Sequence, residues 1–202
     1  MQRTRIIVMA KAPLAGFAKT RLIPALGAEG AARLAQRLLA ETMAQARRAG
    51  LGEVELCCAP DATHPAFVAQ AKPGGVLLSA QGEGDLGTRM HRAFVRGLEQ
   101  ARQVIVIGTD VPALDAAYLQ AASAALEGAD AVIAPAADGG YALIGLRQPA
   151  PRLFEQMPWS TDRVLALTRE RLADYGWRHT ELPTLHDIDV AADLVHLPPT
   201  WL

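Results

Sequence analysis

The sequence predicts a three-layer α/β protein, with a mostly parallel mixed sheet covered by helices on both faces. Two observations predict it: short continuous apolar runs, and segments with helical spacing of apolar residues that alternate with them. Strands are expected at residues 6–10, 54–59, 76–79, 104–108, 131–134, 141–146 and 177–182. Helices are expected at 28–49, 86–101, 118–126 and 162–172. Strands that are apolar throughout are typical of sheets buried on both sides.

Each element rests on its own pattern, taken in chain order. The run at 6–10 is too short for a helix, and the segment at 28–49 places leucines at helical spacing before Gly50 ends it. The segment at 86–101 repeats apolar residues every four positions. The run at 104–108 is the most hydrophobic of the chain, and two glycines break the strands at 131–134 and 141–146.

Length and composition favour one domain over residues 1–202. Half of the 202 residues (50%) are hydrophobic and 20% are charged, which suits a globular core. A formal net charge of -1 argues against nucleic acid or an anionic membrane as partner. No apolar run reaches the roughly 18 residues of a membrane span, and the first one soon meets Lys11. Adjacent Cys57 and Cys58 are expected to fill a buried strand, and a reducing, cytoplasmic location is expected.

The first candidate site is the loop at 11–22, which follows the first strand. It holds Lys11, Lys19 and Arg21, with Pro13 and Gly16 to shape the turn. Three cations around a glycine loop can neutralise a polyphosphate, and ligands of such sheets bind beyond the carboxyl ends of the strands. The spacing is not that of a Walker A loop. The alternative interpretation is a solvated basic loop.

The second candidate is Asp110, which directly follows the strand at 104–108. A carboxylate in this position can hold Mg²⁺ or Mn²⁺ against substrate phosphates, and the alternative is a turn cap. Asp187 and Asp189 are candidates for a further metal ligand. In an extended segment they point to opposite sides, so one is expected to face the metal and the other to cap the helix that follows.

Further candidates follow other strands. Asp85, Gly87 and Arg89 open the helix at 86–101; Asp85 suits a helix N-cap, whereas Gly87 and Arg89 are candidates for nucleotide contact. An acceptor side is expected around Trp159 and the segment Asp138-Gly139-Gly140-Tyr141, for which a simple turn is the alternative. Scattered histidines argue against a zinc centre.

Seven motifs in this order resemble the DUF2064 family of bacterial glycosyltransferase-A-like proteins, which are associated with radical-SAM or arsenosugar pathways. The motifs lie at residues 9–13, 19–22, 85–90, 108–112, 138–146, 159–161 and 187–189. The resemblance spans about residues 5–195. It implies a nucleotide-diphospho-sugar transferase fold, and it extends to enzymes that guanylylate 2-phospholactate or cytidylylate molybdopterin.

The resemblance implies roles for particular residues. Lys11, Lys19 and Arg21 would hold phosphates, and Asp110 would bind the metal, with Asp189 or Asp187 as a second ligand. Asp110 and Lys19 are accordingly the expected catalytic residues. The related enzymes more often carry Thr-Pro-Glu after the second Asp, where this chain has Val-Ala-Ala.

Two chemistries remain open, and both need a small-molecule acceptor. The family favours glycosyl transfer from a nucleotide sugar. Three loop cations favour nucleotidyl transfer from a nucleoside triphosphate with release of pyrophosphate. A non-catalytic nucleotide-binding protein is the third interpretation. The base, the sugar, the acceptor and the oligomeric state cannot be read from the sequence.

Overall fold

The computed structural model describes residues 2–72 and 74–201, and its centre is a seven-stranded sheet in the order β3-β2-β1-β4-β6-β5-β7. The strands are β1 Gln2–Lys11, β2 Val54–Ala59, β3 Val76–Ala80, β4 Ala101–Ile107, β5 Ala131–Pro135, β6 Tyr141–Leu146 and β7 His179–Glu181. Neighbouring strands are parallel except where β6 runs antiparallel to β4 and β5. The expected mostly parallel mixed sheet is confirmed.

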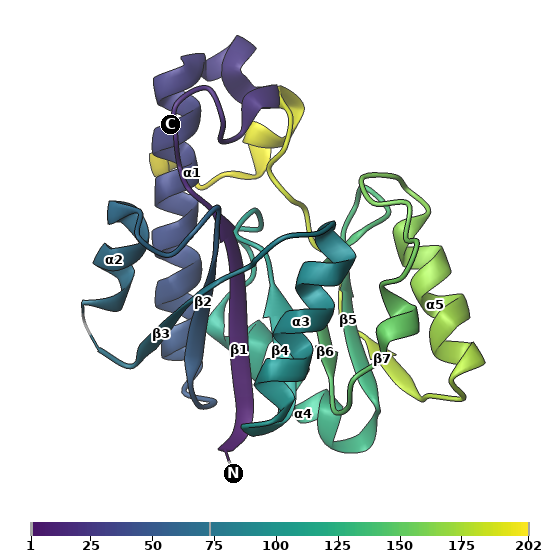
Figure 1. The fold of residues 1–202 in the computed structure, drawn as a ribbon. Helices are drawn as coiled ribbons and strands as arrows, with labels where there is room; N and C mark the ends of the chain where they lie inside the picture. Colours follow the sequence, from purple (N-terminus) through teal and green to yellow (C-terminus); the bar gives the residue numbers. More distant parts are fainter. Residues whose placement is uncertain (1, 73, 202) are drawn as a thin grey trace.

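Helices cover the sheet on both faces, which confirms the three-layer arrangement (Figure 1). The helices are α1 Ile23–Arg48, α2 Pro65–Ala71, α3 Leu86–Leu98, α4 Ala116–Gly128 and α5 Val164–Asp174, with short 3-10 turns η1 Thr20–Leu22, η2 Pro151–Leu153, η3 Ala191–His196 and η4 Pro199–Trp201. One core contains Met43 of α1 and Leu119 of α4, and the other contains Phe94 of α3 and Leu172 of α5.

The cysteine pair shows how one strand serves both cores. Cys58 packs in the core beneath α1, whereas Cys57 packs in the core beneath α3. Successive side chains of a strand point to opposite faces, so the two sulfurs cannot meet. Both are free and buried, as expected for strand filling. Burial raises the pKa of both thiols, that of Cys58 to about 12, which keeps them protonated at neutral pH.

Some element boundaries differ from the prediction for local reasons. The helix α1 begins at Ile23, but Gly27 interrupts it with a φ of 70°, so its regular part starts near the predicted residue 28. The helix α3 ends at Leu98 because β4 already starts at Ala101. The helix α2 was not expected, since a seven-residue helix that starts with Pro65 has little periodicity to read.

A third, smaller core attaches the C-terminal segment to the first half of α1. Ile188 and Leu197 pack there against Leu22, Leu34 and Leu38. This packing brings residues 186–190 beside the loop that follows β1. No helix in the described ranges is apolar over a length that would cross a membrane.

Six of the seven strands end at the same edge of the sheet, because only β6 runs in the opposite direction. The loops after β1, β3, β4 and β5 therefore gather at this carboxyl edge, together with the start of β6 and the segment after β7. Every candidate residue from the sequence belongs to one of these loops or to the segments that pack on them. In open α/β sheets this edge is where ligands bind.

Candidate functional site

Four of the candidate residues form two ion pairs at the carboxyl edge, here termed the charged cluster: Lys19, Arg21, Asp110 and Asp189. Lys19 Nζ lies 2.7 Å from Asp110 Oδ1, and Arg21 Nη1 lies 2.6 Å from Asp189 Oδ2. The Lys19 side chain is only 7% exposed, whereas the Asp110 side chain is 52% exposed. The structure thus brings together cations and carboxylates that lie up to 168 positions apart in the chain.

Lys19 also joins the three segments that carry the charged cluster. Its ammonium donates to the carbonyl oxygen of Ile188 as well as to Asp110. The Ile188 amide in turn donates to the Asp110 carbonyl oxygen at 2.9 Å. Lys19 itself has a left-handed backbone (φ 49°, ψ 44°), an uncommon state for a residue with a side chain. The left-handed backbone of Lys19 therefore directs its side chain into the charged cluster.

Asp187 and Asp189 point to different neighbours, as their alternation predicted. The residue between them, Ile188, is fully buried in the third core. Asp189 reaches Arg21, whereas Asp187 is half-buried near Asp138. Burial first, and the Asp138 charge second, raise the pKa of Asp187 above its ordinary value.

Neither of these two carboxylates caps the helix that follows. Asp193 does so: its Oδ2 accepts from the amides of Asp189 at 2.9 Å and Val190 at 2.7 Å. The expectation that Asp187 or Asp189 is a cap is therefore wrong. The cap comes from inside η3, so that both earlier carboxylates keep their oxygens free of this role.

The charged cluster fits a divalent metal ion that a substrate helps to hold. The described residues contain no group of three or more histidine, cysteine or acidic side chains placed to bind a metal on their own. Asp110 and Asp189 nevertheless supply carboxylates from two segments that hydrogen-bond to each other. Mg²⁺ is usually bound by one or two carboxylates together with substrate phosphates. The donor set suits such an ion.

The rest of the first loop is open to solvent. Lys11 ends β1 with an exposed side chain, and it forms no ion pair with any residue that the structure describes. Gly16 has a φ of 81°, a conformation that side chains other than glycine's adopt rarely. Pro13 is half-buried between them. The Lys11 ammonium and the Gly16 amide could donate to a phosphate while Pro13 shapes the turn, and this contact remains a prediction.

The loop between β3 and α3 is held mainly by its own residues. Asp85 is the N-cap, since its Oδ1 accepts from the Thr88 amide at 2.8 Å. Hydrogen bonds from the Thr88 hydroxyl first, and from the Thr88 amide second, lower the pKa of Asp85. Arg89 Nε donates to the Gly84 carbonyl oxygen at 2.8 Å. This confirms the cap interpretation of Asp85. Contact of Gly87 or Arg89 with a nucleotide remains a prediction.

Gly87 has a packing reason to be glycine. A Cβ atom at this position would lie 2.4 Å from the Phe154 carbonyl oxygen and 3.1 Å from Trp159 Nε1. The helix α3 can approach the segment at 154–159 only without a side chain here. Gly87 therefore fixes where Trp159 lies.

We expect Gly87→Ala to destabilise the protein by about 1–3 kcal/mol, because the added methyl group must displace a backbone oxygen. Thermal unfolding should show a fall in the melting temperature of several degrees, at about 2–4 °C per kcal/mol. Gly128→Ala is the matched control, since nothing lies within 4 Å of a Cβ there. Equal melting temperatures for the two variants would disprove the packing role.

Two aromatic side chains that the sequence predicted for the acceptor side, Tyr141 and Trp159, contact each other; their contact with an acceptor remains a prediction. The rings of Tyr141 and Trp159 meet edge to face, with centroids 6.4 Å apart. The Tyr141 hydroxyl and Trp159 Nε1 are both buried, and neither has a hydrogen-bond partner among the described residues. Burial also raises the pKa of Tyr141. A buried polar group without a hydrogen-bond partner costs free energy. The Tyr141 O–H and the Trp159 N–H are therefore donors that a ligand could use.

The segment Asp138-Gly139-Gly140 forms a tight turn that also packs closely. Asp138 Oδ1 accepts from the Gly140 amide at 2.8 Å. Gly139 has a φ of 89°, and a Cβ there would lie 2.5 Å from the Asp162 carbonyl oxygen. The turn interpretation is therefore correct in structure. The Asp138 carboxylate lies close enough to Asp187 to raise the pKa of that residue.

Two positions escaped the sequence patterns. Ile188 positions both late carboxylates, and its apolar side chain between two aspartates is the signal that could have identified an anchor. Gln81 is 6% exposed, and its Nε2 donates to the carbonyl oxygens of Ala10 and Cys57. It ties the ends of β1 and β2 together. A single glutamine before a glycine gives no sequence signal for this role.

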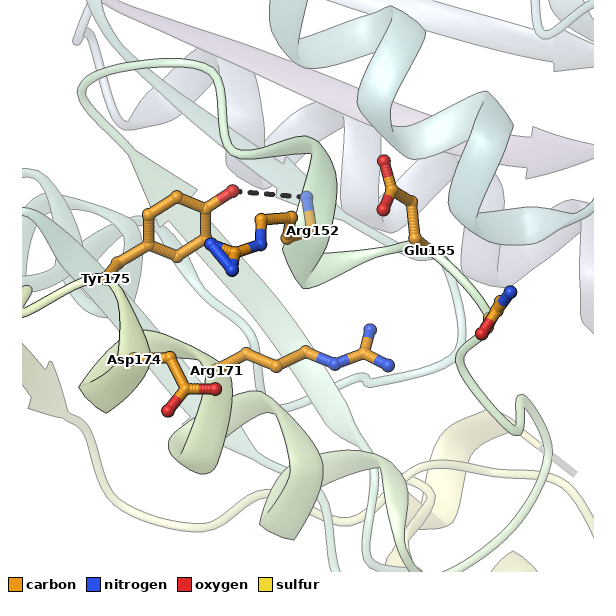
Figure 2. A pocket seen from close by; sticks show the side chains of 6 residues that line it. Arg152, Glu155, Arg171, Asp174 and Tyr175 are labelled. Atoms are coloured by element: carbon orange, nitrogen blue, oxygen red, sulfur yellow. Dashed lines mark hydrogen bonds between the residues drawn. The ribbon is translucent and has the colours of Figure 1, made fainter.

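A separate pocket of about 280 Å³ lies between η2 and α5 (Figure 2). Its lining residues are Arg152, Glu155, Gln156, Arg171, Asp174 and Tyr175. The Tyr175 hydroxyl accepts from the Arg152 amide at 3.2 Å. The guanidinium groups of Arg152 and Arg171 point in different directions in Figure 2. None of the residues predicted for phosphate, metal or acceptor binding lines this pocket.

Comparison with known proteins supports the same family as the motifs. The sequence model described as "Uncharacterized protein conserved in bacteria (DUF2064)" matches residues 42–161, more than half of the chain. A comparison with curated proteins gives no match.

Solved structures share the fold. A "putative nucleotide-diphospho-sugar transferase" from Desulfovibrio desulfuricans G20 is similar at 29% identity and a TM-score of 0.90, over 99% of this chain and 88% of that one. A CMP:2-keto-3-deoxy-manno-octonic acid synthetase complexed with CTP has 12% identity and a TM-score of 0.55, with 96% of both chains covered. Rv0371C from Mycobacterium tuberculosis H37Rv, in complex with manganese, has 17% identity and a TM-score of 0.59, with 98% of both chains covered.

Proposed function

Because the chain belongs to the DUF2064 family and has the fold of nucleotide-diphospho-sugar transferases and nucleotidyltransferases, we propose that it is a metal-dependent glycosyltransferase that uses a nucleotide sugar as donor. The proposal includes the whole chain, residues 1–202, as one transferase domain. The charged cluster at the carboxyl edge of the sheet is the observation that carries it.

The charged cluster suits a reaction in which a phosphate leaves. In glycosyl transfer the bond between the sugar and the diphosphate breaks, and negative charge develops on the leaving nucleoside diphosphate. Lys11, Lys19 and Arg21 would bind these phosphate oxygens. Asp110 and Asp189 would hold Mg²⁺ or Mn²⁺, which neutralises the charge on the leaving group. Positioning and charge stabilisation supply most of the rate in such reactions.

The acceptor would lie on the other side of the reacting centre. Tyr141 and Trp159 would offer an apolar wall with two polar atoms that have no partner among the described residues, and the neighbouring carboxylates Asp138 and Asp187 would complete it. A small hydroxyl-bearing acceptor fits these groups. Its attacking hydroxyl must lose a proton, and one of the two carboxylates is the available base in this part of the site.

Nucleotidyl transfer is the second candidate, and one observation favours it. The first loop holds three cations, which suits a triphosphate better than a diphosphate. The synthetase of similar fold that was solved in complex with CTP, a nucleoside triphosphate, supports this alternative. In that case the nucleotide is transferred and pyrophosphate leaves.

Removal of the loop cations separates the two chemistries. Lys19→Ala and Arg21→Ala should each weaken nucleotide binding at least about tenfold, because each loses a charge-assisted contact. For a glycosyltransferase, the wild type binds the nucleotide sugar better than the triphosphate and releases no pyrophosphate. For a nucleotidyltransferase, the loss is larger for the triphosphate. Calorimetric affinities and a pyrophosphate assay measure both.

Arg33→Ala is the control, since this exposed arginine lies on α1 outside the charged cluster. It should leave both affinities unchanged. Wild-type protein that binds neither ligand class at millimolar concentration with metal present would refute both chemistries. A protein that binds nucleotides but transfers nothing to any acceptor would instead support the non-catalytic interpretation.

A further inference from the structure

The residues assigned to phosphate and to metal are already each other's partners. Lys19 Nζ lies 2.7 Å from Asp110 Oδ1, and Arg21 Nη1 lies 2.6 Å from Asp189 Oδ2. A cation that is neutralised at this distance attracts a phosphate only weakly. By the same reasoning, a carboxylate beside an ammonium group attracts a metal ion only weakly.

Burial makes the Lys19 pair the stronger restraint of the two. The Lys19 side chain is 7% exposed, whereas that of Arg21 is 64% exposed. An ammonium group has three donors, and Lys19 uses two of them on Asp110 and on the Ile188 carbonyl oxygen. Only one remains for a ligand while Asp110 neutralises its charge.

The charges of the cluster balance, and this decides what it can accept. Two cations and two carboxylates sum to zero. A divalent metal alone would leave about two excess positive charges in the cluster, and a diphosphate alone about two excess negative charges. Both together restore neutrality. The cluster therefore penalises either ligand alone and favours the pair.

We propose that the charged cluster binds metal and diphosphate jointly, by an exchange of ion-pair partners. Lys19 and Arg21 pass from the carboxylates to phosphate oxygens as Asp110 and Asp189 pass to the metal. This exchange rests on the proposed function. It implies in addition that the metal ion raises the affinity for the diphosphate, and that the diphosphate raises the affinity for the metal ion. Such coupling between ligands typically amounts to about 5- to 150-fold in affinity.

Two substitutions each remove one member of the Lys19–Asp110 ion pair and leave the other member free to bind its ligand. Lys19→Met keeps the buried stem and frees Asp110, so Mn²⁺ alone should bind about threefold or more tightly than to wild type. Asp110→Asn frees Lys19, so pyrophosphate in the presence of a chelator should also bind about threefold or more tightly. A threefold rise in affinity lies within the range of free energies that exposed and partly exposed ion pairs contribute. Loss of a nearby positive charge alone also raises Mn²⁺ affinity somewhat, so the exchange is measured by the excess of Lys19→Met over a variant that removes an unpaired lysine.

The measurements are Mn²⁺ binding by electron paramagnetic resonance and pyrophosphate binding by calorimetry, with circular dichroism to check the fold. Lys11→Met is the matched control, since it removes the unpaired lysine of the same loop. It should weaken pyrophosphate binding and change Mn²⁺ affinity less than Lys19→Met does. If Lys19→Met does not fold, the Asp110→Asn arm decides alone.

Unchanged or lower affinity for the remaining ligand in a folded variant would overturn the exchange. That result would leave the proposed function intact if wild-type protein still binds a nucleotide sugar with metal. Conversely, the expected rises in a protein that binds no nucleotide of either class would support the exchange and refute the proposed function.

Discussion

Asp110→Asn is expected to abolish metal-dependent nucleotide binding while the protein stays folded. The substitution keeps the size of the side chain and removes the charge that would hold the metal. Since a metal ion contributes several kcal/mol to phosphate chemistry, transfer activity should fall by about a hundredfold or more. The fold should survive, because the Asp110 side chain is 52% exposed and its ion pair contributes at most about 1 kcal/mol.

Nucleotide affinity measured with and without Mg²⁺ tests this expectation, together with thermal unfolding. The metal should improve wild-type affinity and leave that of the variant unchanged. Asp174→Asn is the matched control: this exposed aspartate at the end of α5 lies outside the charged cluster. Equal metal dependence of nucleotide binding in Asp110→Asn and wild type would exclude Asp110 as a metal ligand.

The second large effect separates Asp189 from Asp187. Asp189 belongs to the charged cluster and pairs with Arg21, so Asp189→Asn should lower transfer activity by about a hundredfold or more. Asp187 faces Asp138 instead, so Asp187→Asn should leave metal-dependent nucleotide affinity within about threefold of wild type. Steady-state kinetics and calorimetry on the two variants provide the comparison.

The pH dependence of thermal stability is expected to distinguish Asp187→Asn from the wild type. The raised pKa of Asp187 means that the folded state holds its proton above the ordinary pKa of 3.8. The stability of the wild type should therefore lose this contribution as pH rises from 3.8 through the raised pKa. The Asn variant lacks this loss and should melt higher at neutral pH. Equal losses of metal-dependent nucleotide affinity in Asp187→Asn and Asp189→Asn would show that the two carboxylates share one role.

The fold was predictable because its signals are local. Apolar runs such as the one in β4 and helical spacing such as that of α3 need only neighbouring residues to be recognised. The order of the strands and the antiparallel direction of β6 were not predicted, because they depend on pairing between segments far apart in the chain. The short helix α2 was missed because seven residues give no clear period.

The site was predictable in composition but not in pairing. The sequence identified Lys19, Arg21, Asp110 and Asp189, since charged residues after buried strands stand out. It did not show that these cations and carboxylates contact each other, because the contacts span up to 168 positions. It also assigned the cap of η3 to the wrong aspartates. Asp193 lies within the turn that it caps, where no spacing rule pointed.

Because Ile188 is anchored in the third core and not in the two main cores, the sheet can be folded while the ligand-binding site is still incomplete. Lys19 meets Ile188 across 169 positions of chain, so this contact carries a larger loop-closure entropy cost than the local contacts of the helices. The sheet and its two main cores do not include Ile188. A molecule with the third core open would keep nearly all of its secondary structure and still lack Asp189 at the site. The circular dichroism spectrum of such a molecule would match that of the folded protein. In a ligand-binding titration the same molecule would contribute no binding site.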